Sequence, residues 1–335
     1  MSLSPFIRKP ASIQRSMLLV IVALVPGIIA YVWQIGAGML LNIAIACMTA
    51  LACEAAVLAL RRRPVAIALK DGSALVTAVL IALAFPPIVP WWLTVLAVFI
   101  AIVLAKHLYG GLGQNPFNPA MVAYCAIIVS YPALMSQWPA PGQLDFAAQA
   151  ELILGGYRDI DAISGATALD TMRTTLRAGH GAVGEVLRGD AFGFLGGRGW
   201  EIIGFAYLLG GVFLLSTRVI SWHIPAAFFC TFFLVSGAFW LVDAARFAPP
   251  WFHLASGGAM LSTFFIITDP VTGATTPLGK IIFAAGVALI AWLIRTFGVY
   301  PDGIAFAILL MNLCVPLIDM KTQPAVFGYR GKEAP

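Results

Sequence analysis

Apolar runs that approach the length of a membrane crossing recur along the whole chain, separated by short polar breaks. A helix needs about 20 apolar residues to cross a bilayer. Because lipid offers the backbone no hydrogen-bond partners, such runs must cross as helices. The sequence therefore predicts an all-α polytopic membrane protein with about ten transmembrane helices. The expected spans are 17–34, 38–60, 73–86, 91–107, 119–135, 201–217, 222–242, 254–268, 279–298 and 302–318.

The basic residues predict how these spans are oriented. If the N-terminus lies inside, the inside loops hold thirteen Lys and Arg, and the short outside loops hold only Arg246 and Arg295. This asymmetry follows the positive-inside rule. We therefore expect both termini in the cytoplasm and residues 136–200 in the periplasm, with the protein in a bacterial inner membrane. Because the basic residues lie in short loops between spans, we expect no nucleic-acid partner.

The order of the spans predicts an internal symmetry. Five spans precede the long polar segment and five follow it, and an odd number makes two equivalent halves opposite in orientation. Residues 69–77 also align with residues 254–262, and each stretch opens the third span of its half. The sequence thus predicts a first five-helix repeat in 1–135, an outside loop in 136–200 and a second, inverted repeat in 201–335.

Residues 161–167 read Asp-Ala-Ile-Ser-Gly-Ala-Thr and resemble the acceptor site at which a flavin transferase esterifies FMN phosphate to the last hydroxyl. That hydroxyl is Thr167. Asp161 and Ser164 complete the pattern, and we interpret Asp161 as a recognition residue for the transferase. Gly165 and Ala166 keep the backbone bare enough for an enzyme and a bulky cofactor to approach. The alternative is that 164–167 is only an N-cap turn.

A second stretch, Asp269 to Thr275, fits the same pattern. The expected topology places it inside, whereas the transferases of this kind act outside the cytoplasmic membrane, so Thr167 is the predicted attachment site. Residues 168–177 read as a short helix whose N-terminus would favour the phosphate. Arg173 is either a partner for phosphate or ring or a solvated side chain.

The cysteines do not indicate a metal centre. The five of them lie singly in or beside apolar runs, with no Cys-x-x-Cys spacing. We therefore expect no metal site and no cysteine-only iron–sulfur cluster in this chain alone. No residue is predicted to be catalytic.

Several stretches together resemble a known family. The chain resembles the D-type membrane subunit of the Rnf complex, a ferredoxin–NAD electron-transfer machine that moves ions. More distantly, it resembles the B-type membrane subunit of the sodium-translocating NADH:quinone oxidoreductase. The stretches that carry this likeness are Ser4–Phe6, Met17–Val20, Ala23–Gly27, Asp71–Thr77, Pro90–Trp92, Gly110–Ala120, Ser164–Thr167 and Thr268–Thr272.

The resemblance implies a fold similar to urea and ammonium channels, with inverted five-helix halves. It implies covalent FMN at Thr167 and a second, noncovalent flavin, either riboflavin or FMN. It also implies a complex whose other membrane and peripheral subunits include a second flavin-carrying subunit and iron–sulfur subunits. In such a complex this chain relays electrons coupled to movement of Na⁺ or H⁺, and it is not expected to be active alone.

Carboxylates at or within the spans are candidates for an ion path. Glu54 is the one carboxylate well inside a span, where a charge must be paired, protonated or facing a cavity. It could conduct ions, bind a neighbouring subunit or satisfy backbone groups. Asp71, Asp269 and Asp319 fall at cytoplasmic span ends, where they are either caps or part of an ion or flavin site. His107 has the same two interpretations.

Two other functions remain open at this stage. The first is a urea- or ammonium-type solute channel without a redox role. The outside loop and its flavin motif argue against this channel. The second is a scaffold that anchors other subunits and carries no electrons. The Trp residues near span ends are interpreted as interfacial anchors.

Overall fold

The computed structural model describes residues 12–155, 165–178 and 181–324. Within these ranges the regular structure is helical, apart from two isolated antiparallel bridges, one of which joins Trp138 to Gly165. The all-α prediction is therefore confirmed. Asp161 and Ser164, which belong to the predicted attachment motif, lie outside the described residues.

Helices occupy all the predicted spans of the first half, and a short one lies between the second and third spans. They are α1 (Ile13–Gln34), α2 (Gly38–Leu60), α3 (Val65–Leu69), α4 (Ser73–Ala84), α5 (Trp91–Phe99), η1 (Ile100–His107), α6 (Pro119–Ser130) and α7 (Pro132–Met135). The fourth span consists of α5 and the π-helix η1, and the fifth is divided between α6 and α7.

The second half follows the same order after a loop whose described residues include three short helices. The loop contains α8 (Phe146–Leu154), α10 (Ala168–Arg177) and α11 (Val183–Val186). The second half contains α12 (Trp200–Ser216), α13 (His223–Val242), α14 (Pro250–Ala255), α15 (Ala259–Leu261), η2 (Ser262–Ile266), α16 (Pro277–Phe297) and α17 (Ile304–Thr322). The eighth predicted span is thus interrupted between α14 and α15.

Five of these helices are long and apolar enough to cross a membrane: α1, α2, α13, α16 and α17. Shorter apolar helices occupy Ser73–Ala84, Trp91–His107, Pro119–Ser130 and Trp200–Ser216. Large apolar side chains also point away from the protein interior, as with Ile29 at 63% and Leu234 at 68% exposed. Such surfaces suit contact with lipid rather than water. The chain is a polytopic helical membrane protein.

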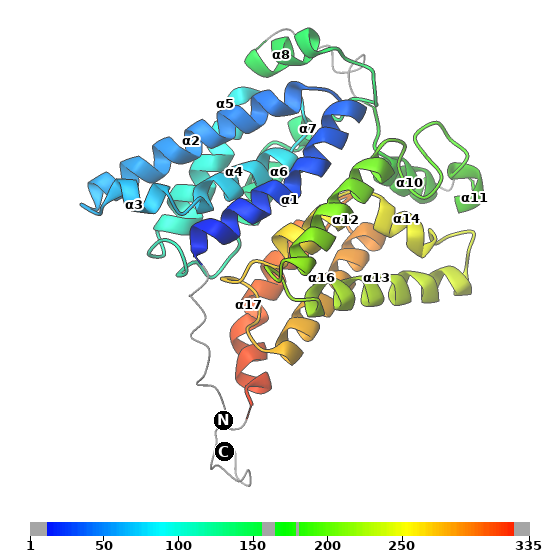
Figure 1. Cartoon of the computed structure of the whole chain (residues 1–335). Helices are drawn as coiled ribbons and strands as arrows, with labels where there is room; N and C mark the ends of the chain where they lie inside the picture. The colour runs from blue at the N-terminus through cyan, green and yellow to red at the C-terminus, as the bar shows by residue number, and fades with distance from the viewer. Residues whose placement is uncertain (1–11, 156–164, 179–180, 325–335) are drawn as a thin grey trace.

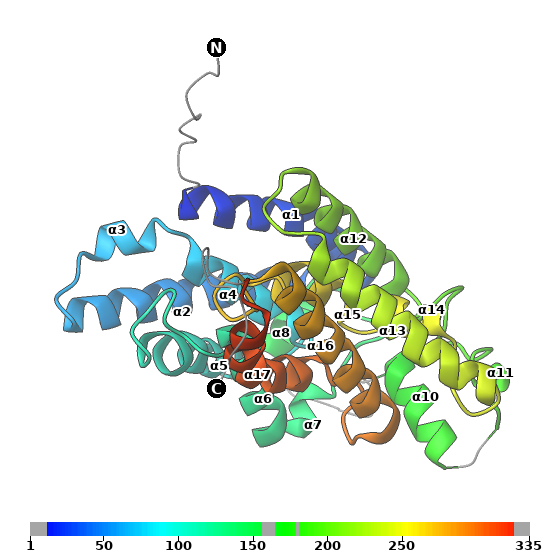
Figure 2. The same cartoon turned by 90° about the horizontal axis from the view of Figure 1, so that it is seen from below.

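The two halves meet along two pairs of helices. Figure 1 shows the first half in blue and cyan beside the second half in green to red, with α1 alongside α12. Figure 2 shows the same pair from another direction, and α6 packs against α17. Loop helices α8 and α10 lie at the opposite end of the bundle from the start of α1 and the end of α17 (Figure 1).

Glycines allow α1 and α12 to approach closely. A Cβ on Gly27 would overlap the ring of Tyr207, and a Cβ on Gly210 would overlap the backbone carbonyl of Ala23. Helices in membranes commonly associate through small residues, because these let the backbones come near each other. The junction between the two halves therefore depends on the absence of side chains at these positions.

We expect Gly210→Ala to destabilise the protein, because the new methyl group must displace backbone atoms of α1. Overpacking of this kind costs about 1–3 kcal/mol. The thermal midpoint of the purified protein in detergent measures the effect. Gly237→Ala on α13 is the matched control, since its Cβ would meet Pro250 at an ordinary distance of 3.7 Å. Equal midpoints for the two variants would contradict this account of the helix junction.

Candidate cofactor site

Thr167 is the N-cap residue of α10. Its hydroxyl oxygen accepts a hydrogen bond of 3.2 Å from the backbone N–H of Asp170. The preceding segment is held by Gly165, whose N–H donates to the Trp138 carbonyl at 2.9 Å. The predicted helix over 168–177 is thus confirmed, and Thr167 lies at its N-terminus. There the free N–H groups and the helix dipole favour a negatively charged group.

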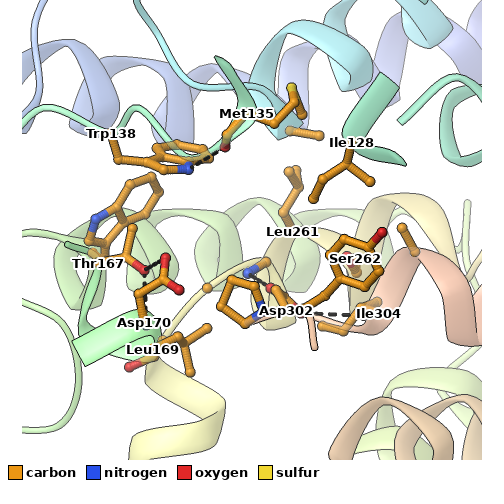
Figure 3. Close-up of a pocket in the computed structure, with 18 of the residues that line it drawn as sticks. Ile128, Met135, Trp138, Thr167, Leu169, Asp170, Leu261, Ser262, Asp302 and Ile304 are labelled. Carbon is orange, nitrogen blue, oxygen red and sulfur yellow. Dashed lines mark hydrogen bonds between the residues drawn. The ribbon is translucent and has the colours of Figure 1, made fainter. Parts of the chain in front are cut away.

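A pocket of about 450 Å³ opens beside Thr167, and Thr167 forms part of its lining. This volume lies within the range of roughly 300–1,000 Å³ that is typical of ligand sites. Trp138 and Trp200 line the same pocket and contact each other edge to face at a centroid distance of 5.2 Å. Figure 3 shows Thr167 and Asp170 at one side of the pocket, beside Trp138. The cavity is large enough for an aromatic ligand attached to Thr167.

The wall that carries Asp302 and Ile304 is built around the break between α14 and α15 (Figure 3). Gly257 has a left-handed φ of 66°, and the N–H of Gly258 donates to the Asp302 carboxylate at 2.6 Å. Arg295 pairs with Asp302 at 3.1 Å and donates to the His253 carbonyl at 2.6 Å. Arg295 thus fixes the interrupted backbone that forms this side of the pocket.

Two groups of opposite charge lie near Thr167: the Asp170 carboxylate, to which the Thr167 hydroxyl donates at 3.4 Å, and the Arg173 guanidinium. Arg173 lines the pocket and pairs with Asp170 at 3.0 Å, one turn along α10. Both side chains are partly exposed, so this pair alone contributes little stability. A phosphate on Thr167 would compete with the Asp170 carboxylate for the Arg173 guanidinium. The residues present therefore fit a phosphate-linked ligand.

Two other residues of the motif, Gly165 and Ala166, are among those that the structure describes. Ala166 is exposed, and a Cβ on Gly165 would meet Ala140 and Trp138 at 3.7 and 3.8 Å, which are ordinary contacts. Packing of the folded protein therefore does not require glycine at position 165. This leaves recognition by a modifying enzyme, the role predicted for the motif, as a reason for a small residue there.

The second copy of the motif has a different environment. The Thr275 hydroxyl and N–H both donate to the Asp319 carboxylate at 2.9 Å. Asp269 accepts from the Thr272 hydroxyl at 2.8 Å and from the Val271 N–H at 3.1 Å. Burial raises the pKa of Asp269, and these two hydrogen bonds act in the opposite direction. Thr275 is exposed and is not part of the pocket lining.

The structure brings two of the predicted ion-path residues into one network and leaves the third elsewhere. Glu54 is buried and accepts two hydrogen bonds from Lys106, at 2.8 and 2.7 Å. Lys106 also donates to the Ser73 hydroxyl, which donates to Asp71 at 2.6 Å. Nε2 of His107 lies 3.4 Å from Glu54. The buried charge of Glu54 is therefore paired, and its part in ion movement stays a prediction.

Asp269 belongs to a second group, which joins the two halves. The Asn118 side chain contacts Asp269 at 3.5 Å, and the Asn118 backbone N–H donates to Oδ1 of the Asn312 side chain at 3.2 Å. Asn312 also donates to the Thr272 carbonyl at 2.9 Å. These bonds connect the start of α6 with α17 and with the loop after η2.

Sequence reasoning did not assign Trp138, Trp200, Tyr31, Tyr207 or Asp302 to a site. The tryptophans stand near span ends, where interfacial anchoring explains them equally well. Their place in the pocket wall results from tertiary packing of segments far apart in sequence. Trp138 and Trp200 both lie in the predicted loop 136–200 that contains Thr167.

Apolar helices and a ligand-sized pocket beside a loop helix define a polytopic membrane protein with a cofactor-sized cavity. Residues 1–328 match the model of the NQR2, RnfD, RnfE family. The chain belongs to this family, which confirms the resemblance found in the sequence. It is 46% identical over 347 residues to the D-type subunit of the ion-translocating oxidoreductase complex of Citrobacter koseri, covering 98% of each chain. Proteins of the same description from Salmonella paratyphi B and Salmonella typhi are also 46% identical, covering 98% of this chain and 97% of theirs.

We expect Lys106→Met to lower stability strongly, because it leaves the Glu54 carboxylate buried without its cation. Removing one partner of a buried pair costs about 3–5 kcal/mol. Adding Glu54→Gln should restore most of the loss. The thermal midpoint in detergent measures both variants, and Lys70→Met is the control because Lys70 lies outside this buried network. If Lys106→Met melted like Lys70→Met, the pairing would have no structural importance.

Proposed function

We propose that this chain is the membrane subunit of a redox-driven, ion-translocating electron-transfer complex, and that it carries FMN covalently on Thr167. The observation that carries the proposal is the position of the Thr167 hydroxyl. It lies at the N-terminus of α10 and at the edge of a pocket lined by aromatic residues. Relatives that match nearly the whole chain are described as the D-type subunit of an ion-translocating oxidoreductase complex.

The local chemistry supports a phosphate ester at this hydroxyl. Once esterified, the Thr167 oxygen can still accept the hydrogen bond from the Asp170 N–H. The added phosphate is negative, so the N-terminus of α10 favours it and Arg173 is the cation nearest along the helix. Asp161 and Ser164 complete the pattern that the transferase would recognise, together with Gly165 and Ala166.

The flavin would supply the ability to accept and donate one or two electrons. The chain's own residues would hold it: Thr167 by the ester, Arg173 by its charge, and the pocket walls by contact with the ring. Electrons would come from iron–sulfur and flavin-carrying partner subunits, since the described residues hold no group of three or more possible metal ligands. The chain would act as part of this translocase, coupled to Na⁺ or H⁺, and a second flavin would bind without a covalent link.

We also propose that the two halves are inverted repeats. Support comes from the third span of each half, which begins after a left-handed glycine: Gly72, with φ 77°, precedes α4, and Gly257, with φ 66°, precedes α15. These glycines occupy equivalent positions in the alignment of 69–77 with 254–262. The N–H that follows each glycine donates to a carboxylate, Ser73 to Asp71 and Gly258 to Asp302.

Each half also has a buried cation beside the start of its third span. Lys106, at the end of the fourth span, donates to the Ser73 side chain, and Arg295, near the end of the ninth, donates to the Ser256 carbonyl. The first spans of the two halves, α1 and α12, contact each other, and so do the fifth spans, α6 and α17. A two-fold axis in the membrane plane would produce both contacts. Ten spans would place both termini on the same side, and the distribution of basic residues favours the cytoplasm for that side and the periplasm for 136–200.

Replacing the acceptor hydroxyl tests the cofactor assignment. We expect Thr167→Val, produced together with the flavin transferase, to lose all covalent flavin, because valine has no oxygen to esterify. Flavin fluorescence of the denatured protein on a gel measures this loss, and the mass of the peptide that contains residue 167 measures the adduct. Thr275→Val is the matched control and should keep the flavin. Fluorescence that persisted in Thr167→Val would refute the assignment.

Labelling of single cysteines tests the topology. In a cysteine-free background, a membrane-impermeant maleimide should label Phe194→Cys in intact cells, since Phe194 is 92% exposed and lies on the loop side of the bundle. Arg63→Cys, between α2 and α3, should react only after lysis. Mass spectrometry of each variant measures the label. The opposite pattern would place the loop in the cytoplasm and out of reach of an exported transferase.

A further inference from the structure

A second pocket, of about 430 Å³, has walls that come from α10, from α14 with the segment before it, and from the end of α16. Thr167 does not line it. The helix α10 contacts α16 here, as Figure 2 shows. Among the described residues that line this pocket there is no carboxylate, but there are four arginines: Arg173, Arg177, Arg246 and Arg295.

Two of these four charges are already matched. Arg173 pairs with Asp170 at 3.0 Å. The Arg295 side chain is only 1% exposed and pairs with Asp302 at 3.1 Å. Arg177 and Arg246, in contrast, are exposed and form no ion pair within the described part of the chain. The unmatched positive charge of the pocket therefore belongs to Arg177 and Arg246.

Contacts hold both of these guanidinium groups at the pocket wall. Nη2 of Arg177 donates to the carbonyls of Phe297 and Gly298, at 2.9 and 2.6 Å. Its Nε and Nη1 have no such partner among the described residues, and a guanidinium has five N–H donors in all. The Arg246 guanidinium lies 5.9 Å from the centre of the Phe247 ring, which lines the pocket. Both arginines thus have N–H groups left for a ligand.

The aromatic surroundings of the pocket are those of a membrane surface. Trp240 and Trp251 precede and follow the segment that carries Arg246, and they contact each other edge to face at 5.3 Å. Tryptophans gather where a membrane meets water. Positive residues are rare in short outside loops. In the topology proposed above those loops hold only Arg246 and Arg295, and both line this pocket.

An apolar row leads away from the pocket along α16. Leu289, Leu293 and Phe297 are spaced four residues apart, so they lie on one face of the helix. They are 42%, 41% and 56% exposed, respectively. Phe297 belongs both to this row and to the pocket lining. The positively charged pocket is therefore continuous with a surface that suits acyl chains.

We propose that this pocket binds the headgroup of an anionic phospholipid. Its phosphate accepts charge-assisted hydrogen bonds from Arg177 and Arg246, and an acyl chain follows the row on α16. Guanidinium groups match the geometry of phosphate oxygens, and basic pockets between membrane helices bind anionic lipid headgroups. Because Arg177 belongs to α10, the lipid ties the helix that begins after Thr167 to the membrane. Lipid binding here does not require a flavin on Thr167.

The test is the thermal midpoint of the purified full-length protein in detergent, titrated with phosphatidylglycerol. A ligand that binds only the folded protein raises this midpoint. We expect the double variant Arg177→Gln/Arg246→Gln to bind phosphatidylglycerol about a hundredfold more weakly, about tenfold for each lost charge-assisted contact. Native mass spectrometry counts the lipid that stays bound. The matched control is Arg188→Gln/Arg198→Gln, which removes two exposed arginines of the same loop outside both pocket linings.

Arg246→Gln alone separates lipid binding from folding. Within the described residues only the backbone of Arg246 donates hydrogen bonds, so its midpoint without lipid should equal that of the parent. Its affinity for phosphatidylglycerol should fall about tenfold. An unchanged affinity in this variant and in the double variant would overturn the inference.

Three further results would overturn it. Equal weakening in the Arg188→Gln/Arg198→Gln control would indicate a general effect of charge. An equal rise in midpoint with phosphatidylcholine of the same acyl chains would show that the headgroup charge is not recognised. An equal rise with inorganic phosphate alone, lost in the Arg177→Gln/Arg246→Gln variant, would assign the pocket to a free anion instead of a lipid. Each of these outcomes leaves the attachment at Thr167 untouched.

Discussion

The structure depends on hydrogen bonds to the backbone groups that are left without partners where a membrane helix is interrupted. Two short apolar helices begin directly after a break in the helical backbone, α4 at Ser73 and α15 at Ala259, and their first N–H groups have no partner within the helix. At each break a buried cation lies close by: Lys106 contacts Ser73, and Arg295 contacts the Ser256 carbonyl. A buried cation is itself expensive and must be paired. Glu54 pairs with Lys106, and Asp302 pairs with Arg295.

The same requirement shapes the pocket. Arg295 holds Asp302, and Asp302 in turn accepts the N–H of Gly258 at the start of the broken span. These residues form one wall, and α10 with Thr167 forms part of another. In a regular helix through Ser256–Gly258, the backbone N–H groups would bond to carbonyls of the same helix. The Gly258 N–H would then not be free to donate to the Asp302 carboxylate. The interruption that is costly in a bilayer is therefore also what gives the pocket polar groups on one side.

Much of the fold could be predicted from local sequence, since apolar runs and capping residues indicate directly where helices lie and begin. Helices occupy the predicted spans, and α10 begins directly after Thr167 as its composition indicates. The pocket could not be predicted in this way, because Trp138, Tyr31 and Trp200 come together only through tertiary packing. The pairing of Glu54 with Lys106, 52 residues apart, is of the same kind. A lone carboxylate in a span indicates that a partner is needed, but the sequence does not identify that partner.

A covalent link changes what a pocket has to do. If Thr167 carries the flavin, the ring has a high effective concentration at the cavity, so the walls need little affinity of their own to keep it there. Polar contacts are then free to favour one oxidation state over the other, as only differential binding changes an equilibrium. A mostly apolar pocket with a few polar groups suits this task. Stronger polar contacts that bound both states equally would hold the ring more tightly and leave its potential unchanged.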